Sequence, residues 1–121
     1  MLNQVNLIGN LAKDVDIKFM PNGTKVAITS IAVNNRVKKQ DGTIKEKTLF
    51  IDIIAYSGRA EALEKYTQKG SRLRITGELE LQQWEKDGQK HSKHVVSVNE
   101  FDFLDVKKGE ANTINEEPVS D

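Results

Sequence analysis

The strongest constraint on the fold is a long alternation of apolar and polar residues between positions 73 and 84. Alternation at a period of two places the two sets on opposite faces of a β-strand. The apolar face comprises Leu73, Ile75, Leu79 and Leu81, and the polar face comprises Arg74, Thr76, Glu78, Glu80, Gln82 and Trp84. A tryptophan that only fills a core belongs on the apolar face. We therefore expect Trp84, the only tryptophan of the chain, to serve an interface or a ligand.

Similar patterns elsewhere predict an all-β domain with one helix. Turn signals occur at Met20 to Gly23, at Asp41-Gly42 and at Asp87-Gly88. The expected strands are 5–19 with a bend at Gly9, 26–34, 48–56, 73–84 and 91–104, and the expected helix is 59–66, with Ser57 as its N-cap and Gly70 as its terminator. Five mostly antiparallel strands with a helix between the third and the fourth is the topology of the five-stranded OB-fold barrel.

Length and charge set limits on domain organisation and binding. The 121 residues suffice for one domain with a single core. We expect this domain at 1–106 and a short disordered acidic tail at 107–121, where the hydrophobic pattern and the aromatic residues are lost. Residues 1–106 carry 16 basic and 14 acidic groups. Because this net charge is too small to hold nucleic acid by the bulk field alone, such binding must come from local clusters and stacking.

The composition also bears on the compartment. The chain has no cysteine, which fits a reducing environment. Residues 1–10 alternate polar and apolar side chains, unlike a signal peptide, and no stretch approaches the roughly 20 apolar residues that span a bilayer. We expect a cytoplasmic protein without a membrane partner.

Candidate binding residues are aromatic and basic. Trp84, Phe50 and Tyr56 lie on polar or mixed faces of different strands, although core packing stays open for Phe50 and Tyr56. Two expected hairpins, 36–47 and 85–94, carry Arg36, Lys38, Lys39, Lys86, Lys90 and Lys93. Arg74 and Lys25 complete the candidate set. Aromatic rings beside positive charge are what stacking on unpaired bases and contact with phosphates require.

The same residues do not favour catalysis. His91 and His94 are three apart, which on a strand directs them to opposite faces, and we interpret both as surface residues. Asp14 and Asp16 share a face, but two carboxylates alone would make a weak cation site. The sequence has no glycine-rich phosphate loop and no nucleophile elbow. We expect no enzyme activity, cofactor, metal or small-molecule substrate.

Several segments in consistent order resemble the bacterial single-stranded DNA-binding protein family. They are Val5 to Leu11, Lys18 to Gly23, the strand from Phe50, the helix from Ala60 to Lys69-Gly70-Ser71, and Thr76 to Trp84. Together they cover about residues 3 to 105. The resemblance implies an OB fold that coats single-stranded DNA in replication, recombination and repair, and that assembles as a homo-oligomer, a tetramer or a dimer. It also places Trp84, Phe50 and Tyr56 at the family's stacking positions.

The chain departs from the family pattern at three places. Arg36-Val37 stands where the family often has another tryptophan, and Asp52 stands where a basic residue is frequent. The family's acidic, Pro-Phe-terminated peptide is absent from Glu116 to Asp121, which puts recruitment of replication proteins through that peptide in doubt and would suit a phage- or plasmid-encoded member.

Two other functions stay open at this point. One is an OB-fold interaction subunit of a replication complex, similar to primosomal accessory proteins, in which the exposed aromatic residues would face a protein partner. The other, weaker alternative is an RNA chaperone, because nothing in the sequence reads a 2′-hydroxyl and so nothing separates DNA from RNA.

Overall fold

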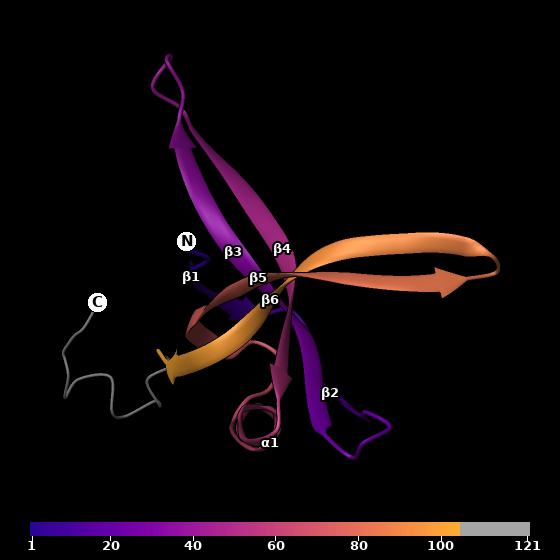
Figure 1. The fold of residues 1–121 in the computed structure, drawn as a ribbon. Coiled ribbons are helices and arrows are strands. Elements are labelled where there is room, and N and C mark those ends of the chain that lie inside the picture. Colours follow the sequence, from indigo (N-terminus) through magenta and orange to yellow (C-terminus); the bar gives the residue numbers. More distant parts are fainter. Residues whose placement is uncertain (105–121) are drawn as a thin grey trace.

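The structure is a computed structural model, and it describes residues 1–104 (Figure 1). The elements in chain order are β1 (Val5–Leu11), β2 (Asp16–Phe19), β3 (Lys25–Lys38), β4 (Ile44–Tyr56), α1 (Gly58–Tyr66), β5 (Arg72–Lys86) and β6 (Gln89–Phe103). The expected tail at 107–121, and with it the domain boundary, lies outside the described residues.

The strands form one sheet that closes into a barrel. Their order is β1-β5-β6-β4-β3-β2, and β1 also pairs with β3. Because β1 and β2 lie one after the other along β3, at Ala32 and Ile31 and then at Ile28 to Lys25, they act as two halves of one strand. The predicted barrel of five strands and one helix is confirmed, with its first strand broken between Leu11 and Asp16.

The barrel interior holds most of the core. Its fully buried side chains include Leu11, Ile31, Ile53, Leu73, Ile75 and Val96. A second, smaller cluster of Val26, Ile54 and Val95 lies on the other side of the same sheet, with Ile28 and Tyr56 packed against it. Neighbours in sequence such as Ile53 and Ile54 therefore face opposite ways, as the alternation of a strand requires. Strands β3, β4 and β6 are apolar on both faces along this stretch.

Helix α1 packs against one end of the barrel through Ala60 and Leu63, which belong to the interior core (Figure 1). Ser57 is the N-cap of this helix, as predicted, and its carbonyl accepts the Glu61 N–H, but its side chain makes no capping hydrogen bond. The helix ends at Tyr66, before Gly70, because Thr67 turns into extended backbone and its hydroxyl donates to the Leu63 carbonyl.

Two glycines allow strands to approach closely. A Cβ atom on Gly9 would lie 2.3 Å from the Ala32 carbonyl oxygen, where β1 crosses β3. A Cβ atom on Gly77 would lie 2.0 Å from the Ser97 carbonyl oxygen, beside a bulge in the pairing of β5 with β6. The expected bend at Gly9 is thus a close backbone crossing that only glycine permits.

Two hairpins project from the barrel, β3–β4 and β5–β6 (Figure 1). The sequence predicts strands at 26–34 and 48–56 for the first hairpin and at 73–84 and 91–104 for the second. In the structure β3 pairs with β4 out to Lys38 and Ile44, and β5 pairs with β6 out to Lys86 and Gln89. The polar segments continue the ladders because the tight turns at Asp41-Gly42 and Asp87-Gly88 hold the strands in register, with positive φ at Gly42, Asp87 and Gly88.

Candidate nucleic-acid interface

Trp84 lies on the β5–β6 hairpin, outside the barrel. Its register partner across the hairpin is His91, and the two rings stack with centroids 5.5 Å apart and an interplanar angle of 19°. The Trp84 side chain is 44% exposed, so it does not fill the core. This position on the polar face agrees with the placement expected from the alternation of residues 73–84.

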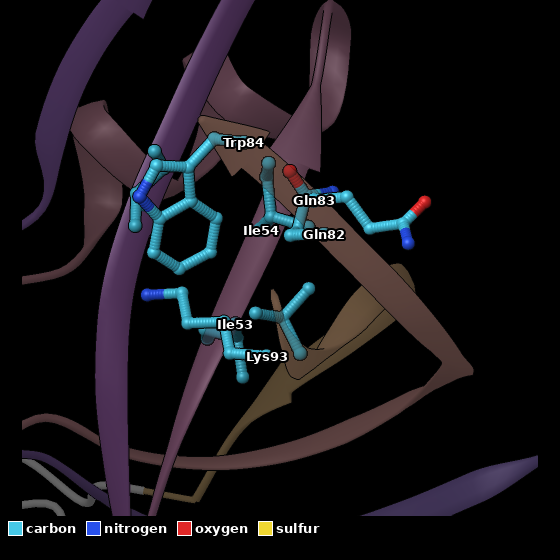
Figure 2. A pocket seen from close by; sticks show the side chains of 8 residues that line it. Ile53, Ile54, Gln82, Gln83, Trp84 and Lys93 are labelled. Atoms are coloured by element: carbon cyan, nitrogen blue, oxygen red, sulfur yellow. The ribbon is translucent and has the colours of Figure 1, made fainter. Parts of the chain in front are cut away.

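A pocket of about 310 Å³ opens beside Trp84 (Figure 2). Its lining comes from four strands and comprises Ile28, Ile53, Ile54, Gln82, Gln83, Trp84, Lys93 and Val95. The floor is mostly aliphatic, because the second hydrophobic cluster reaches the surface here. An apolar floor with an aromatic wall and a few polar groups in the lining suits the face of a planar ring.

Tyr56 packs against the second hydrophobic cluster, whose members Ile54 and Val95 line the pocket. Its hydroxyl donates to the Glu80 carboxylate at 3.1 Å, and the Gln82 amide donates to the same carboxylate oxygen. Burial raises the pKa of the Tyr56 hydroxyl above its ordinary value, and the hydrogen bond to Glu80 raises this pKa further. Tyr56 is half-buried, packs against the second cluster and orients Glu80, so its ring is less accessible than that of Trp84.

Lys93 stands at the mouth of the pocket, on the same side as the Trp84 ring (Figure 2). Its ammonium donates to the Asp52 carboxylate on β4, with Nζ and Oδ2 2.6 Å apart. The side chains are 48% and 33% exposed. This ion pair connects β6 to β4 across the outer face of the barrel.

Phe50 lies farther along β4, on the same face as Asp52 and Ile54, because these residues alternate along the strand. It is 64% exposed and pairs in register with Ala32 of β3. An exposed phenyl ring opposite a small side chain leaves one ring face open. The core-packing alternative for Phe50 is therefore wrong in this chain.

The basic candidates of both hairpins are exposed. Arg36 and Lys38 lie on β3 and Lys39 lies in the turn that follows, while Lys86 and Lys90 lie near the end of the β5–β6 hairpin. Arg36 is the least free of them, since its guanidinium pairs with Glu46 across the hairpin at 3.4 Å. By strand alternation, Arg36 and Lys38 share the face of Phe50 and Lys86 shares the face of Trp84, whereas Lys90 lies on the opposite face of the β5–β6 hairpin.

Arg74 and Lys25 are not brought to this face. Arg74 lies well before Trp84 on β5 and pairs with Asp102. Lys25 begins β3 beside α1, where its ammonium pairs with Glu64, and this hydrogen bond raises the pKa of Lys25. Arg74 and Lys25 stay candidates only for contacts with a long ligand that extends beyond this face.

Sequence reasoning counted Lys93 among the basic candidates but missed its ion pair with Asp52 and the stacking of His91 on Trp84. The stacking has a signal in the two-residue turn at Asp87-Gly88, since counting outward from this turn pairs Trp84 with His91. The interpretation of His91 as a plain surface residue is incomplete, because its ring supports the indole. The contact of Lys93 with Asp52 has no local signal, because it joins strands that are distant in sequence.

The described part of the chain holds neither a metal cluster nor a membrane-spanning helix. No group of three His, Asp or Glu residues within 1–104 could hold a metal ion. No helix in this range is long and apolar enough to cross a membrane.

Comparison with known proteins assigns the family. The model of the Single-strand binding protein family matches residues 2–104, which is most of the chain. The chain belongs to this family. Relatives named single-stranded DNA-binding protein occur in Wolinella succinogenes, 41% identical over 88% of this chain and 67% of that protein, and in Helicobacter hepaticus, 38% identical over 95% and 69%.

Solved structures in the same family agree with the fold. The Plasmodium falciparum SSB in complex with ssDNA has a TM-score of 0.76 and 31% identity, over 87% of this chain and 96% of that one. A deletion mutant of the single-stranded DNA binding protein from Thermus aquaticus also has a TM-score of 0.76, with 30% identity over 88% of this chain. The present chain spans about half of the Thermus chain, 52% of its length.

Proposed function

We propose that this chain binds single-stranded DNA without sequence preference, as a coating protein for replication, recombination and repair. Its membership of the single-strand binding protein family and its likeness to an SSB with ssDNA bound support this function. The activity is binding rather than catalysis. We propose the cytoplasm as its compartment, which a chain without cysteine fits.

The mechanism that we propose is base stacking combined with phosphate contacts. The observation that carries it is the exposed Trp84 ring, held by His91 beside an apolar pocket with a lysine at its mouth. One base would stack at Trp84 and another at Phe50, each contributing about 1 to 3 kcal/mol. Lysines and arginines of the two hairpins would neutralise the backbone on either side.

Fluorescence titration tests this function directly. Trp84 is the only tryptophan, so the intrinsic tryptophan emission comes from the proposed site itself. We expect poly-dT to quench this emission with a saturable stoichiometry that defines a site size. Weak, unsaturable quenching would favour the alternative of a protein-interaction subunit. Parallel titration with dT and rU oligomers of equal length measures the preference for DNA over RNA.

A homo-oligomer, either a tetramer or a dimer, is the second part of the proposal. Large apolar side chains are exposed on β1 and on the outer part of β5, namely Ile8, Leu79 and Leu81. Leu79 and Leu81 lie on the same face of β5, and neighbouring exposed apolar side chains of this kind often mark an interface. Size-exclusion chromatography with light scattering will give the mass, and a monomer at micromolar concentration would contradict this part without affecting DNA binding.

A further inference from the structure

Lys93 is the cation best placed to meet a phosphate beside the proposed stacking site. Of the described residues that line the pocket, Lys93 alone is charged, and its ammonium lies on the Trp84 side (Figure 2). A nucleotide whose base enters the pocket carries its phosphate within a few ångströms of that base. The ammonium is therefore where a phosphate contact is expected.

The Lys93 ammonium already forms an ion pair with a carboxylate of the protein itself, that of Asp52. The Asp52 carboxylate lies 2.6 Å from Nζ and stands on β4 between Phe50 and Ile54, on the same face. Asp52 is thus situated between the two proposed stacking platforms, on the path of a strand that reaches both. Its register partner Ser30 does not satisfy the carboxylate, since the Ser30 hydroxyl donates to the Ile51 carbonyl.

A carboxylate and a phosphate compete for the same donors. Both present anionic oxygens to an ammonium, and an ammonium is a compact charge with three donors that accepts either one. The Lys93 and Asp52 side chains are 48% and 33% exposed, so both contact solvent. A solvent-exposed ion pair can exchange one partner for another anion at low cost.

We propose that Asp52 is a positioning residue that occupies Lys93 as an internal substitute for phosphate until single-stranded DNA displaces it. This inference rests on the proposed function. In the free protein the carboxylate keeps the Lys93 side chain extended over the pocket mouth. When DNA binds, a backbone phosphate replaces the Asp52 carboxylate at Lys93, and the displaced carboxylate repels the phosphates of the DNA. Asp52 therefore lowers both the affinity and its dependence on salt.

The test is to replace Asp52 by its neutral isostere. For Asp52→Asn we expect tighter binding of a dT oligomer at low salt, by roughly two- to fivefold, the range that an exposed ion pair supports. We also expect a slope of log affinity against log salt steeper by up to about 0.7, because Lys93 then neutralises one phosphate in full. Glu100→Gln is the matched control, since it removes one exposed acidic charge from β6 away from the pocket.

A double-mutant cycle separates positioning from simple repulsion. If Asp52 acts through Lys93, the gain from Asp52→Asn disappears in a Lys93→Gln background. A gain that persists undiminished there, or an equal gain from Glu100→Gln, would overturn the proposal. An unchanged affinity for both Asp52→Asn and Asp52→Ser, with wild-type protein still binding, would also overturn it. Absence of saturable binding by the wild type would instead contradict the proposed function.

Discussion

At the scale of single residues, Trp84 is a side chain held in place before any ligand arrives. The imidazole of His91 stacks on the indole ring across the hairpin. A ring fixed in this way loses little conformational freedom when a base stacks on it, so more of the stacking energy remains as affinity. The support from His91 explains how a tryptophan can stay ordered on an exposed hairpin.

Trp84→Ala tests the role of this ring. We expect a loss of about 1 to 3 kcal/mol in binding to poly-dT, with the melting temperature nearly unchanged, because the side chain is outside the core. Since this variant has no tryptophan, binding is measured by anisotropy of a labelled oligomer. Phe19→Ala removes another exposed aromatic ring, on β2, and serves as the control. A large loss of stability with little loss of DNA binding would show that Trp84 serves packing rather than stacking on bases.

Tyr56 gives a prediction for alkaline pH. Its pKa is raised in the folded protein, first by burial and then by the Glu80 carboxylate, so the folded state holds the phenolic proton more tightly than the unfolded state does. The associated stability is complete below the unfolded value of about 10 and is lost as pH rises through the folded value. Denaturant unfolding above about pH 10 should therefore show a steeper fall for wild type than for Tyr56→Phe. Parallel curves would contradict this.

At the scale of elements, β3 and β4 continue farther than the sequence indicates, whereas the limits of β5 and β6 are close to those expected. Alternation of apolar and polar residues predicts a strand only while one face is buried, and the outer part of the β3–β4 hairpin is exposed on both faces. Its ladder is maintained by the turn and by cross-strand partners such as Arg36 with Glu46. The inner parts of the strands and the helix are predictable because they bury a periodic set of side chains.

Salt dependence should map onto these hairpins. Replacing Lys38 and Lys39, or Lys86 and Lys90, by glutamine should reduce the slope of log affinity against log salt by up to about 0.7 for each phosphate that is no longer neutralised. A double replacement at Lys65 and Lys69, near the end of α1, removes the same charge and should leave the slope closer to wild type. If neither hairpin pair changes the slope, the hairpins are not on the DNA path.

The close contacts between strands at Gly9 and Gly77 are predicted not to tolerate an added methyl group. Gly9→Ala and Gly77→Ala each place a Cβ atom against a carbonyl oxygen of the neighbouring strand, which forces the backbone to shift. We expect each to lower the free energy of unfolding by about 1 to 3 kcal/mol, measured by urea denaturation. Gly58→Ala at the start of α1 has open space around it and should be neutral or slightly stabilising. Equal stability of all three variants would show that the strands do not need glycine at positions 9 and 77 to approach each other.

At the scale of the whole molecule, the fold class is predictable from the sequence, whereas the aliphatic floor of the pocket is not. The order of strands and helix suffices for the barrel, since few closed topologies accept it. The pocket is assembled from Ile28, Ile54 and Val95, which lie on three different strands. Their meeting depends on how the barrel closes, because β4 and β6 touch in parallel at residues that are far apart in sequence.

The distribution of charge over the whole chain leads to a prediction for residues 109–121. This segment contains four acidic residues and no Lys or Arg. Negative charge on the same chain repels phosphate, most strongly at low salt. Deletion of 109–121 should therefore leave the melting temperature intact and leave dT affinity equal or slightly higher, measured by anisotropy. A loss of binding on deletion would show that the segment belongs to the site.

The way in which the barrel closes also bears on the order of events in folding. Each hairpin is joined by a tight turn and pairs along its full length, whereas β4 meets β6 only through Ile53 with Val96 and Ile54 with Ser97. Hairpins form in microseconds from local contacts, but the seam between them requires closure of a long loop. We therefore expect the two hairpins to form before the seam that joins them, and the pocket beside Trp84 to exist only after the seam has formed.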